Sequence, residues 1–158
     1  KSVENRVYPH QIAFNCLPHI DVFMENGYTK EEMKMVDETH KILGDRSIEV
    51  SPTAVRVPVF YSHSESISVE TELPMKVEEI KDLLSSSPGI SLIDNPEKNE
   101  YPLAIDACGK GGVFVGRVRT DINRDNMVNF WVVSDNLLKG AAYNAVQIAE
   151  LALKRAGI

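Results

Sequence analysis

The chain has 158 residues, of which 43% are hydrophobic and 25% are charged, and its formal net charge is −6. Length and composition predict one globular domain, 1–158, with its own core. The negative charge excludes the broad basic surface that binds nucleic acid or anionic membranes. No apolar run approaches the roughly 18 residues that a membrane helix needs, so we expect a cytoplasmic protein.

The first elements are an extended segment and a well-marked helix. Residues 11–17, QIAFNCL, form an apolar run that Pro18 closes, and they predict a strand or a buried extended segment. Thr29 can cap a helix, Glu32 completes a capping box three residues later, and Gly44 stands just beyond the end. The helix therefore covers residues 30–43, with an apolar face formed by Met33, Val36, His40 and Leu43.

The hydrophobic period then changes from helical to alternating. β-branched residues predict strands at 47–51, 53–61 and 65–73. An amphipathic helix at 75–86 and a short strand at 89–94 follow.

The last third of the chain adds three strands and a long helix. LAIDA (103–107) predicts a short strand, and glycines at 109–112 predict a turn into 113–121. That strand pairs with 126–135 as a hairpin. The final helix covers 136–156. Because no regular βαβ repeat is present, the class is α+β, with a mixed, mainly antiparallel sheet covered by helices.

The stretch RVPVFYSHS, residues 56–64, places a fixed cation and a titratable imidazole on one predicted strand. Arginine can hold a carboxylate through two parallel hydrogen bonds, and histidine can transfer a proton near neutral pH. Residues seven apart on a regular strand face opposite ways, so Arg56 and His63 converge only if the strand bends near Pro58. A structural arginine at a half-exposed strand remains an alternative.

Glu31 and Lys34 are neighbours on the first turns of the predicted helix. They form either a surface ion pair or a binding pair, in which Lys34 holds a phosphate and Glu31 an amino group. Lys110, in GKGG, lacks the spacing of a phosphate loop and indicates a turn. No metal-ligand pattern is present, so we expect no metal. Cys16 and Cys108 lie far apart and have no neighbouring cation in sequence, so we expect reduced, unreactive thiols.

Four stretches carry a family resemblance that covers nearly the whole chain. They are YPHQIAFNCLPHIDVFMENGYTKEEMKM (8–35), AVRVPVFYSHSESISVETE (54–72), GGVFVGRVR (111–119) and FWVVSDNLLKGAAYNAVQIAE (130–150). In this order they resemble the C-terminal half of the aspartate-semialdehyde dehydrogenase family. The resemblance implies the catalytic and dimerisation fold shared with glyceraldehyde-3-phosphate dehydrogenase, and a homodimer or homotetramer.

The resemblance also implies a reaction and residue roles. The family interconverts aspartate semialdehyde, phosphate and NADP with aspartyl phosphate and NADPH through a cysteine thioester, in lysine, threonine and methionine biosynthesis. His63 resembles its acid/base and Arg56 its clamp on the substrate carboxylate. Glu31 resembles the partner of the substrate amino group and Lys34 the phosphate cation. Asn136, in the SDN motif, resembles an amide that reaches the cofactor.

Two parts of the family pattern are not found in the chain. Cys16 follows Asn15 but precedes Leu17, so the family's Asn-Cys-Ser/Thr nucleophile motif is absent, as is the glycine-rich dinucleotide loop. The chain starts KSVENRVYPHQ without a Met. We therefore expect a fragment that is inactive alone, whose final helix, 136–156, packs toward an NADP-binding domain outside it.

Two alternatives remain open at this stage. The chain could act only as a dimerisation module. It could also belong to an enzyme like N-acetyl-glutamyl-phosphate reductase, whose acetylated substrate has no ammonium for Glu31.

Overall fold

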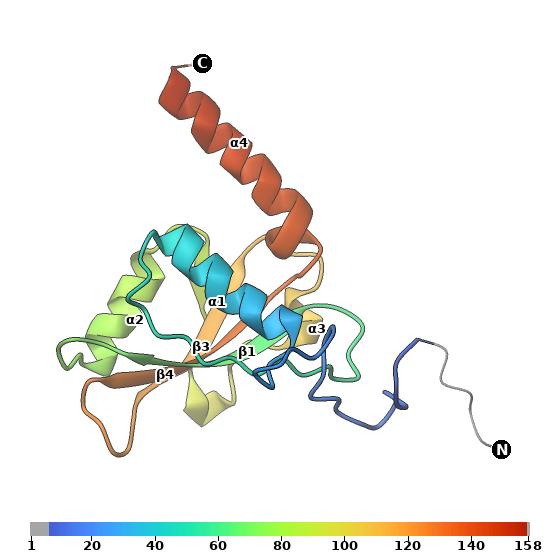
Figure 1. The fold of residues 1–158 in the computed structure, drawn as a ribbon. Helices are drawn as coiled ribbons and strands as arrows, with labels where there is room; N and C mark the ends of the chain where they lie inside the picture. Colours follow the sequence, from blue (N-terminus) through green and yellow to red (C-terminus); the bar gives the residue numbers. More distant parts are fainter. Residues whose placement is uncertain (1–6, 158) are drawn as a thin grey trace. The chain divides into compact units, whose positions relative to one another are not determined.

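The computed structural model describes residues 7–157, and the chain divides into two compact units, Lys1–Pro58 and Val59–Ile158 (Figure 1). Unit 1 contains helix α1, and unit 2 contains the sheet.

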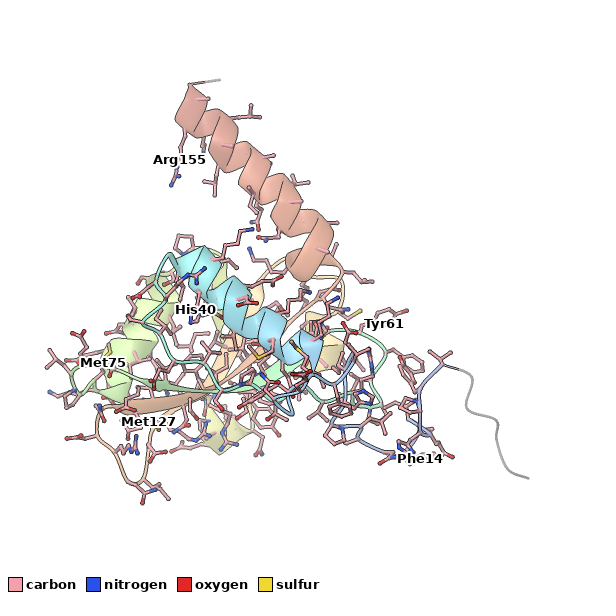
Figure 2. All side chains as sticks on the ribbon, in the orientation of Figure 1. Phe14, His40, Tyr61, Met75, Met127 and Arg155 are labelled. Atoms are coloured by element: carbon pink, nitrogen blue, oxygen red, sulfur yellow. The ribbon has the colours of Figure 1, made fainter. Side chains whose placement is uncertain are left out.

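Unit 1 is built around helix α1 (Lys30–Leu43). The predicted capping box is confirmed: the Thr29 hydroxyl accepts the Glu32 N–H at 3.3 Å, and the Glu32 carboxylate accepts the Thr29 N–H at 2.7 Å. The helix ends at Gly44, whose φ of 70° is the left-handed conformation that glycine adopts freely. His40, labelled in Figure 2, donates its Nε2–H to the Ile48 carbonyl at 2.7 Å and so fixes the chain that leaves the helix.

The strands predicted at 11–17, 47–51 and 53–61 are wrong. Within residues 7–61 the extended chain forms no ladder, only two isolated antiparallel bridges, Leu17 with Arg56 and Phe23 with Thr29. Pro52 and Pro58 have no N–H to donate to a ladder. Val55, Val57 and Val59 are exposed rather than packed in a core. The β-branched composition therefore gives extended chain here, without a neighbouring strand.

Unit 2 contains a four-stranded sheet in the order β1-β4-β3-β2. Strands β1 (His63–Glu70), β4 (Met127–Ser134) and β3 (Val113–Thr120) are antiparallel neighbours. Strand β2 (Ile90–Leu92) runs parallel to β3. This confirms the mixed, mainly antiparallel sheet of an α+β fold.

Helix α2 (Val77–Ser86) covers one face of this sheet. Its Ile80 is 6% exposed and packs with buried Val115, Val118 and Val128 of β3 and β4. The helix predicted at 75–86 is thus confirmed, and its apolar face packs against the sheet to form the core of unit 2.

The strand predicted at 103–107 is wrong, because Ala104–Ala107 form a single helical turn, α3. A five-residue window does not distinguish a strand from a helical turn by periodicity. In the turn, Ala107 is buried while Ile105 lies in solvent. Ahead of it, Pro96–Lys98 form a short 3-10 turn, η1.

The chain ends in two consecutive helices. Leu138–Ala142 form a π-helical turn, η2, which leads directly into helix α4 (Tyr143–Ala156). A helix was predicted for 136–156, but its π start was not. No residue of α4 is buried, and Figure 1 shows this helix leaving the sheet of unit 2. Arg155, on the last turn, lies far from that sheet (Figure 2).

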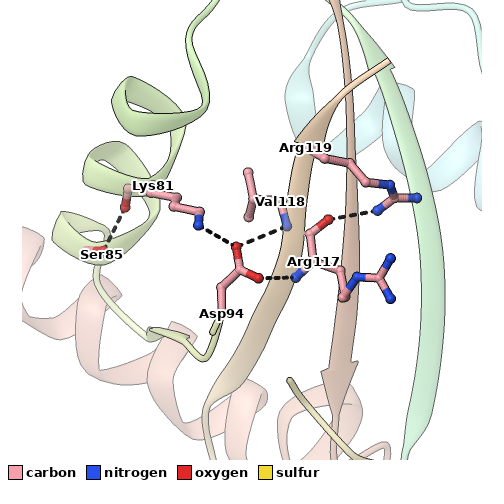
Figure 3. A network of polar contacts seen from close by, with 6 residues as sticks. All are labelled: Lys81, Ser85, Asp94, Arg117, Val118 and Arg119. Atoms are coloured by element: carbon pink, nitrogen blue, oxygen red, sulfur yellow. Dashed lines mark hydrogen bonds and ion pairs between the residues drawn. The ribbon is translucent and has the colours of Figure 1, made fainter. Parts of the chain in front are cut away.

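A β-bulge interrupts β3 next to β4, between Gly116 and Arg119. Arg117 within it has a φ of 56°, in the left-handed region. The Asp94 carboxylate, 2% exposed, accepts the N–H groups of Arg117 at 2.9 Å and Val118 at 3.2 Å, and lies 2.9 Å from the Lys81 ammonium (Figure 3). A Cβ at Gly116 would collide with the Ile93 carbonyl oxygen, so the close approach of β3 to Ile93 requires glycine at this position.

The bulge gives a first prediction. Asp94→Ala removes the acceptor of two backbone N–H groups, and it should lower the free energy of unfolding by about 2 kcal/mol. Urea denaturation followed by Trp131 fluorescence measures this change. Asp125→Ala removes the same charge from an exposed loop position and should change the free energy little. Equal effects of the two substitutions would contradict the role of Asp94.

Candidate functional site

The candidate residues of unit 1 lie on two backbone segments, and the buried carboxylate of Glu32 connects these segments. Glu32 is 7% exposed, and its two oxygens accept the N–H groups of Thr29 at 2.7 Å and Ala54 at 2.9 Å. These hydrogen bonds, the one from Thr29 first, lower the pKa of Glu32. The start of α1, which carries Glu31, is thereby tied to the segment that carries Arg56.

Arg56 is held at its backbone and at its side chain. Its N–H and carbonyl form two 2.9 Å hydrogen bonds with Leu17, a buried residue. Its guanidinium lies 5.0 Å from the centre of the Tyr8 ring, within the range of a cation–π interaction. Arg56 is thus a half-buried, oriented cation, which a carboxylate clamp requires.

Glu31 and Lys34 form the ion pair that their spacing predicts. The Lys34 ammonium lies 3.7 Å from a Glu31 oxygen and 4.0 Å from a Glu38 oxygen. The Lys34 side chain is 55% exposed and that of Glu31 36% exposed, so the pair stabilises the helix only slightly. Both side chains stay accessible to a ligand.

His63 is the first residue of β1, and it pairs with Ser134 of β4 in the ladder. Its side chain is exposed. The residue before it, Ser62, is buried and has a φ of 71°, so the chain turns sharply before His63 enters the sheet.

Asn136 binds the backbone next to His63. Its side-chain oxygen accepts the Ser62 N–H at 2.9 Å, which leaves the amide NH₂ as the group that can donate to a cofactor. Asn136 therefore fits NADP as a single amide donor. It does not by itself form a dinucleotide site. Its position is fixed by the buried neighbour Asp135, whose carboxylate accepts the N–H groups of Gly109, Leu137 and Leu138 at 2.7–2.9 Å. These bonds, that of Gly109 first, lower the pKa of Asp135.

The structure groups the predicted site residues in two sets. Glu31, Lys34 and Arg56 belong to unit 1, whereas His63 and Asn136 belong to unit 2. The expected single strand carrying both Arg56 and His63 is wrong, because Pro58 and the left-handed Ser62 end the extended chain between them.

The residues that hold the candidate site residues in place were not predicted from the sequence. Ser62 carries no sequence signal for its left-handed backbone. Asp135 does carry one, since an aspartate directly before a helix is typical of a cap. Glu32 was recognised as a helix cap, but its bond to Ala54, twenty-two residues away, has no local signature.

Two searches of the described residues found no candidates. Among residues 7–157, no group of three His, Cys, Asp or Glu side chains could hold a metal ion. Over the same residues, no helix is long and apolar enough to cross a membrane. Cys16 and Cys108 are both free and exposed.

The fold defines a class of protein: an α+β domain with a mixed, mainly antiparallel sheet. Residues 1–139 match the family described as semialdehyde dehydrogenase, dimerisation domain. The chain belongs to this family, as its sequence resemblance predicted.

Named relatives agree with this assignment. The aspartate-semialdehyde dehydrogenase of Aquifex aeolicus is 60% identical over 147 residues, which are 93% of this chain and 43% of the relative. The crystal structure of aspartate semialdehyde dehydrogenase II from Vibrio cholerae complexed with ASA is 56% identical, with a TM-score of 0.90, over 96% of this chain and 44% of that one. The Candida albicans enzyme with NADP is 28% identical, with a TM-score of 0.72, over 94% and 46%. The chain spans a little under half the length of these relatives.

The lowered pKa of Glu32 predicts how acid acts on the chain. A carboxyl group whose folded pKa lies below its ordinary value of 4.5 stabilises the fold above that value. This stabilisation is lost as the pH falls through the lowered pKa. Glu32→Gln keeps only one oxygen for two N–H groups, so it should lower the urea midpoint at pH 7 and flatten its fall between pH 5 and pH 3.

Glu25→Gln is the matched control, because Glu25 is an exposed acid of the same unit. Its urea midpoints should follow those of the unmodified chain at every pH. Parallel curves for Glu32→Gln and the unmodified chain would show that this carboxylate has no special part in the fold.

Proposed function

We propose that the chain is the catalytic and dimerisation part of an NADP-dependent aspartate-semialdehyde dehydrogenase. The observation that carries the proposal is the 60% identity to the Aquifex aeolicus enzyme over nearly the whole chain. The Vibrio cholerae complex with ASA and the Candida albicans structure with NADP support the substrate and the cofactor. The rest of such an enzyme, including its cysteine nucleophile and most of its NADP site, would lie in a part that this chain does not contain.

The charges of the chain match the substrate in type. Aspartate semialdehyde carries a carboxylate, an ammonium and an aldehyde. Arg56, oriented by Leu17 and Tyr8, would bind the carboxylate, and Glu31 would bind the ammonium. An acetylated amine has no charge for Glu31, which favours this substrate over that of an N-acetyl-glutamyl-phosphate reductase. Lys34 would hold the phosphate.

His63 would transfer the protons of the reaction. When the cysteine thiolate attacks the aldehyde carbon, His63 protonates the oxygen that becomes negative, and it takes the proton back as the carbonyl forms again. NADP supplies the hydride acceptor for this oxidation, and Asn136 would donate its amide N–H to it. Phosphate oxygen then attacks the thioester carbon and the cysteine leaves as a thiolate, which releases aspartyl phosphate. Once His63 has released its proton to solvent, which accounts for the one proton that the oxidation yields, it would take the proton of the attacking phosphate.

Variants of Arg56 and His63 should separate binding from chemistry in the enzyme that joins this chain to its NADP-binding part. Arg56→Lys keeps the charge but loses the two-pronged grip, so the KM of the semialdehyde should rise about tenfold with little change in kcat. His63→Ala should lower kcat about 100-fold or more. Steady-state NADPH formation in the presence of phosphate measures both effects.

The matched controls are Arg46→Lys and His10→Ala, since both residues are exposed and have no proposed role. They should leave kcat and KM within twofold of the unmodified enzyme. Normal kinetics in the Arg56 and His63 variants would remove the proposed roles.

We also propose that the chain assembles as a homodimer or homotetramer, in keeping with the description of its family. Light scattering of the isolated chain should therefore give at least twice the 17.6 kDa of one copy. A mass of 17.6 kDa over the micromolar range would contradict assembly through this part of the enzyme.

A further inference from the structure

The backbone at Ser62 is unusual among the strained positions of the chain. Five non-glycine residues within 7–157 have a positive φ: Phe14, Asp21, Ser62, Asn99 and Arg117. Ser62 is the buried member of this group, at 7% exposure. A side chain in the left-handed region is disfavoured, and such strain persists only where the surroundings hold it.

Two hydrogen bonds from distant parts of unit 2 hold this conformation. The Asn136 side-chain oxygen accepts the Ser62 N–H at 2.9 Å. The Ser62 hydroxyl donates to the Ala104 carbonyl at 3.0 Å. Asn136 precedes η2 and Ala104 begins α3, so the residue is fixed from both its backbone and its side chain.

The anchors of Ser62 are themselves fixed. The Asp135 carboxylate accepts the Gly109 N–H at 2.7 Å and thus joins the segment that carries Asn136 to the turn after α3. Asp135 is 4% exposed, and it also accepts from Leu137 and Leu138. The segments that carry the Ser62 cluster (Ser62, Ala104 and Asn136) are therefore themselves held by the hydrogen bonds of Asp135.

Ser62 immediately precedes His63, whose own backbone enters the ladder opposite Ser134. The φ of Ser62 thus sets the direction from which His63 leaves the turn, and the ladder fixes the backbone that follows. We infer that Ser62 and Asn136 are positioning residues for His63: the Asn136 carbonyl locks a strained Ser62 backbone so that the imidazole is presented in one orientation. This inference rests on the proposed function for its catalytic consequence, because a misplaced acid/base loses rate steeply.

Asn136 variants test the inference, because the two groups of its amide can be separated. Asn136→Asp keeps an oxygen for the Ser62 N–H and loses the NH₂ donor, and its added charge lies at a helix start, where it is tolerated. Asn136→Leu loses both groups. The first readout is the NMR signal of His63 in the 158-residue chain, which needs neither substrate nor cofactor.

We expect Asn136→Leu to shift and broaden the His63 backbone amide and imidazole signals, and to lower the amide order parameter below about 0.85. Asn136→Asp should leave these signals near their original positions. In the complete enzyme, Asn136→Leu should lower kcat about tenfold beyond the loss seen with Asn136→Asp, whose effect reports the cofactor contact alone.

Ser62→Gly provides a second variant in case Asn136→Leu does not fold. Glycine adopts a positive φ freely and has no hydroxyl for Ala104, so the turn loses its fixed direction. Its kcat should fall about tenfold, with the KM of the semialdehyde within twofold. Asn99→Gly is the matched control, since it relaxes an exposed left-handed residue of the same unit, and it should leave kcat and the His63 signals unchanged.

The outcomes separate this inference from the proposed function. Unchanged His63 signals in both Asn136→Leu and Ser62→Gly would overturn the inference, whatever the enzyme does. Equal effects of Asn136→Leu and Asn136→Asp on these signals would also overturn it. Altered signals with a kcat that is insensitive even to His63→Ala would keep the positioning and refute the proposed acid/base role.

Discussion

Three buried carboxylates that accept backbone N–H groups hold irregular segments of this chain in place. Glu32 joins the start of α1 to Ala54, Asp94 holds the bulge in β3, and Asp135 joins Gly109 to the start of η2. A buried charge is costly unless its hydrogen bonds are satisfied, and a carboxylate can satisfy several N–H donors at once. Glu32 and Asp135 thereby fix segments outside the sheet, and Asp94 fixes a bulge within it, where the regular β3–β4 ladder is interrupted.

Three of the candidate site residues lie within two residues of these contacts. Arg56 follows Ala54 by two residues, Glu31 adjoins Glu32, and Asn136 adjoins Asp135. Regular helices and strands place side chains only at fixed periods, so a site that needs several differently directed groups draws on turns and bulges. The strain at Ser62, next to His63, is an instance of the same arrangement. Within each unit, the acids hold the backbone, and the neighbouring residues are those to which we assign the proposed chemistry.

The sequence predicted best the features whose cause is local. The capping box of Thr29 and Glu32, the glycine end of α1, the amphipathic α2 and the β3–β4 hairpin depend on residues a few positions apart. It failed where the partner is distant: the 53–61 segment has strand composition but no neighbouring strand, and LAIDA is too short for its period to decide. The candidate site residues were predicted from the family resemblance, but their surroundings could not be. No local pattern indicates that Asn136 would bind Ser62, seventy-four residues away.

The final helix carries apolar side chains that the described residues, 7–157, do not bury. Every residue of α4 is exposed or half-buried, and Val146, Ile148, Leu151 and Leu153 lie in solvent. A 14-residue helix is marginal in water on its own, so most of the stability of such a helix must come from packing against another surface. Tyr143 gives α4 one anchor, since its ring lies where a Cβ on Gly111 would be. In the enzyme that we propose, an NADP-binding part would cover the remaining apolar side chains of α4, and Asn136, just ahead of this helix, would stand where the two parts meet.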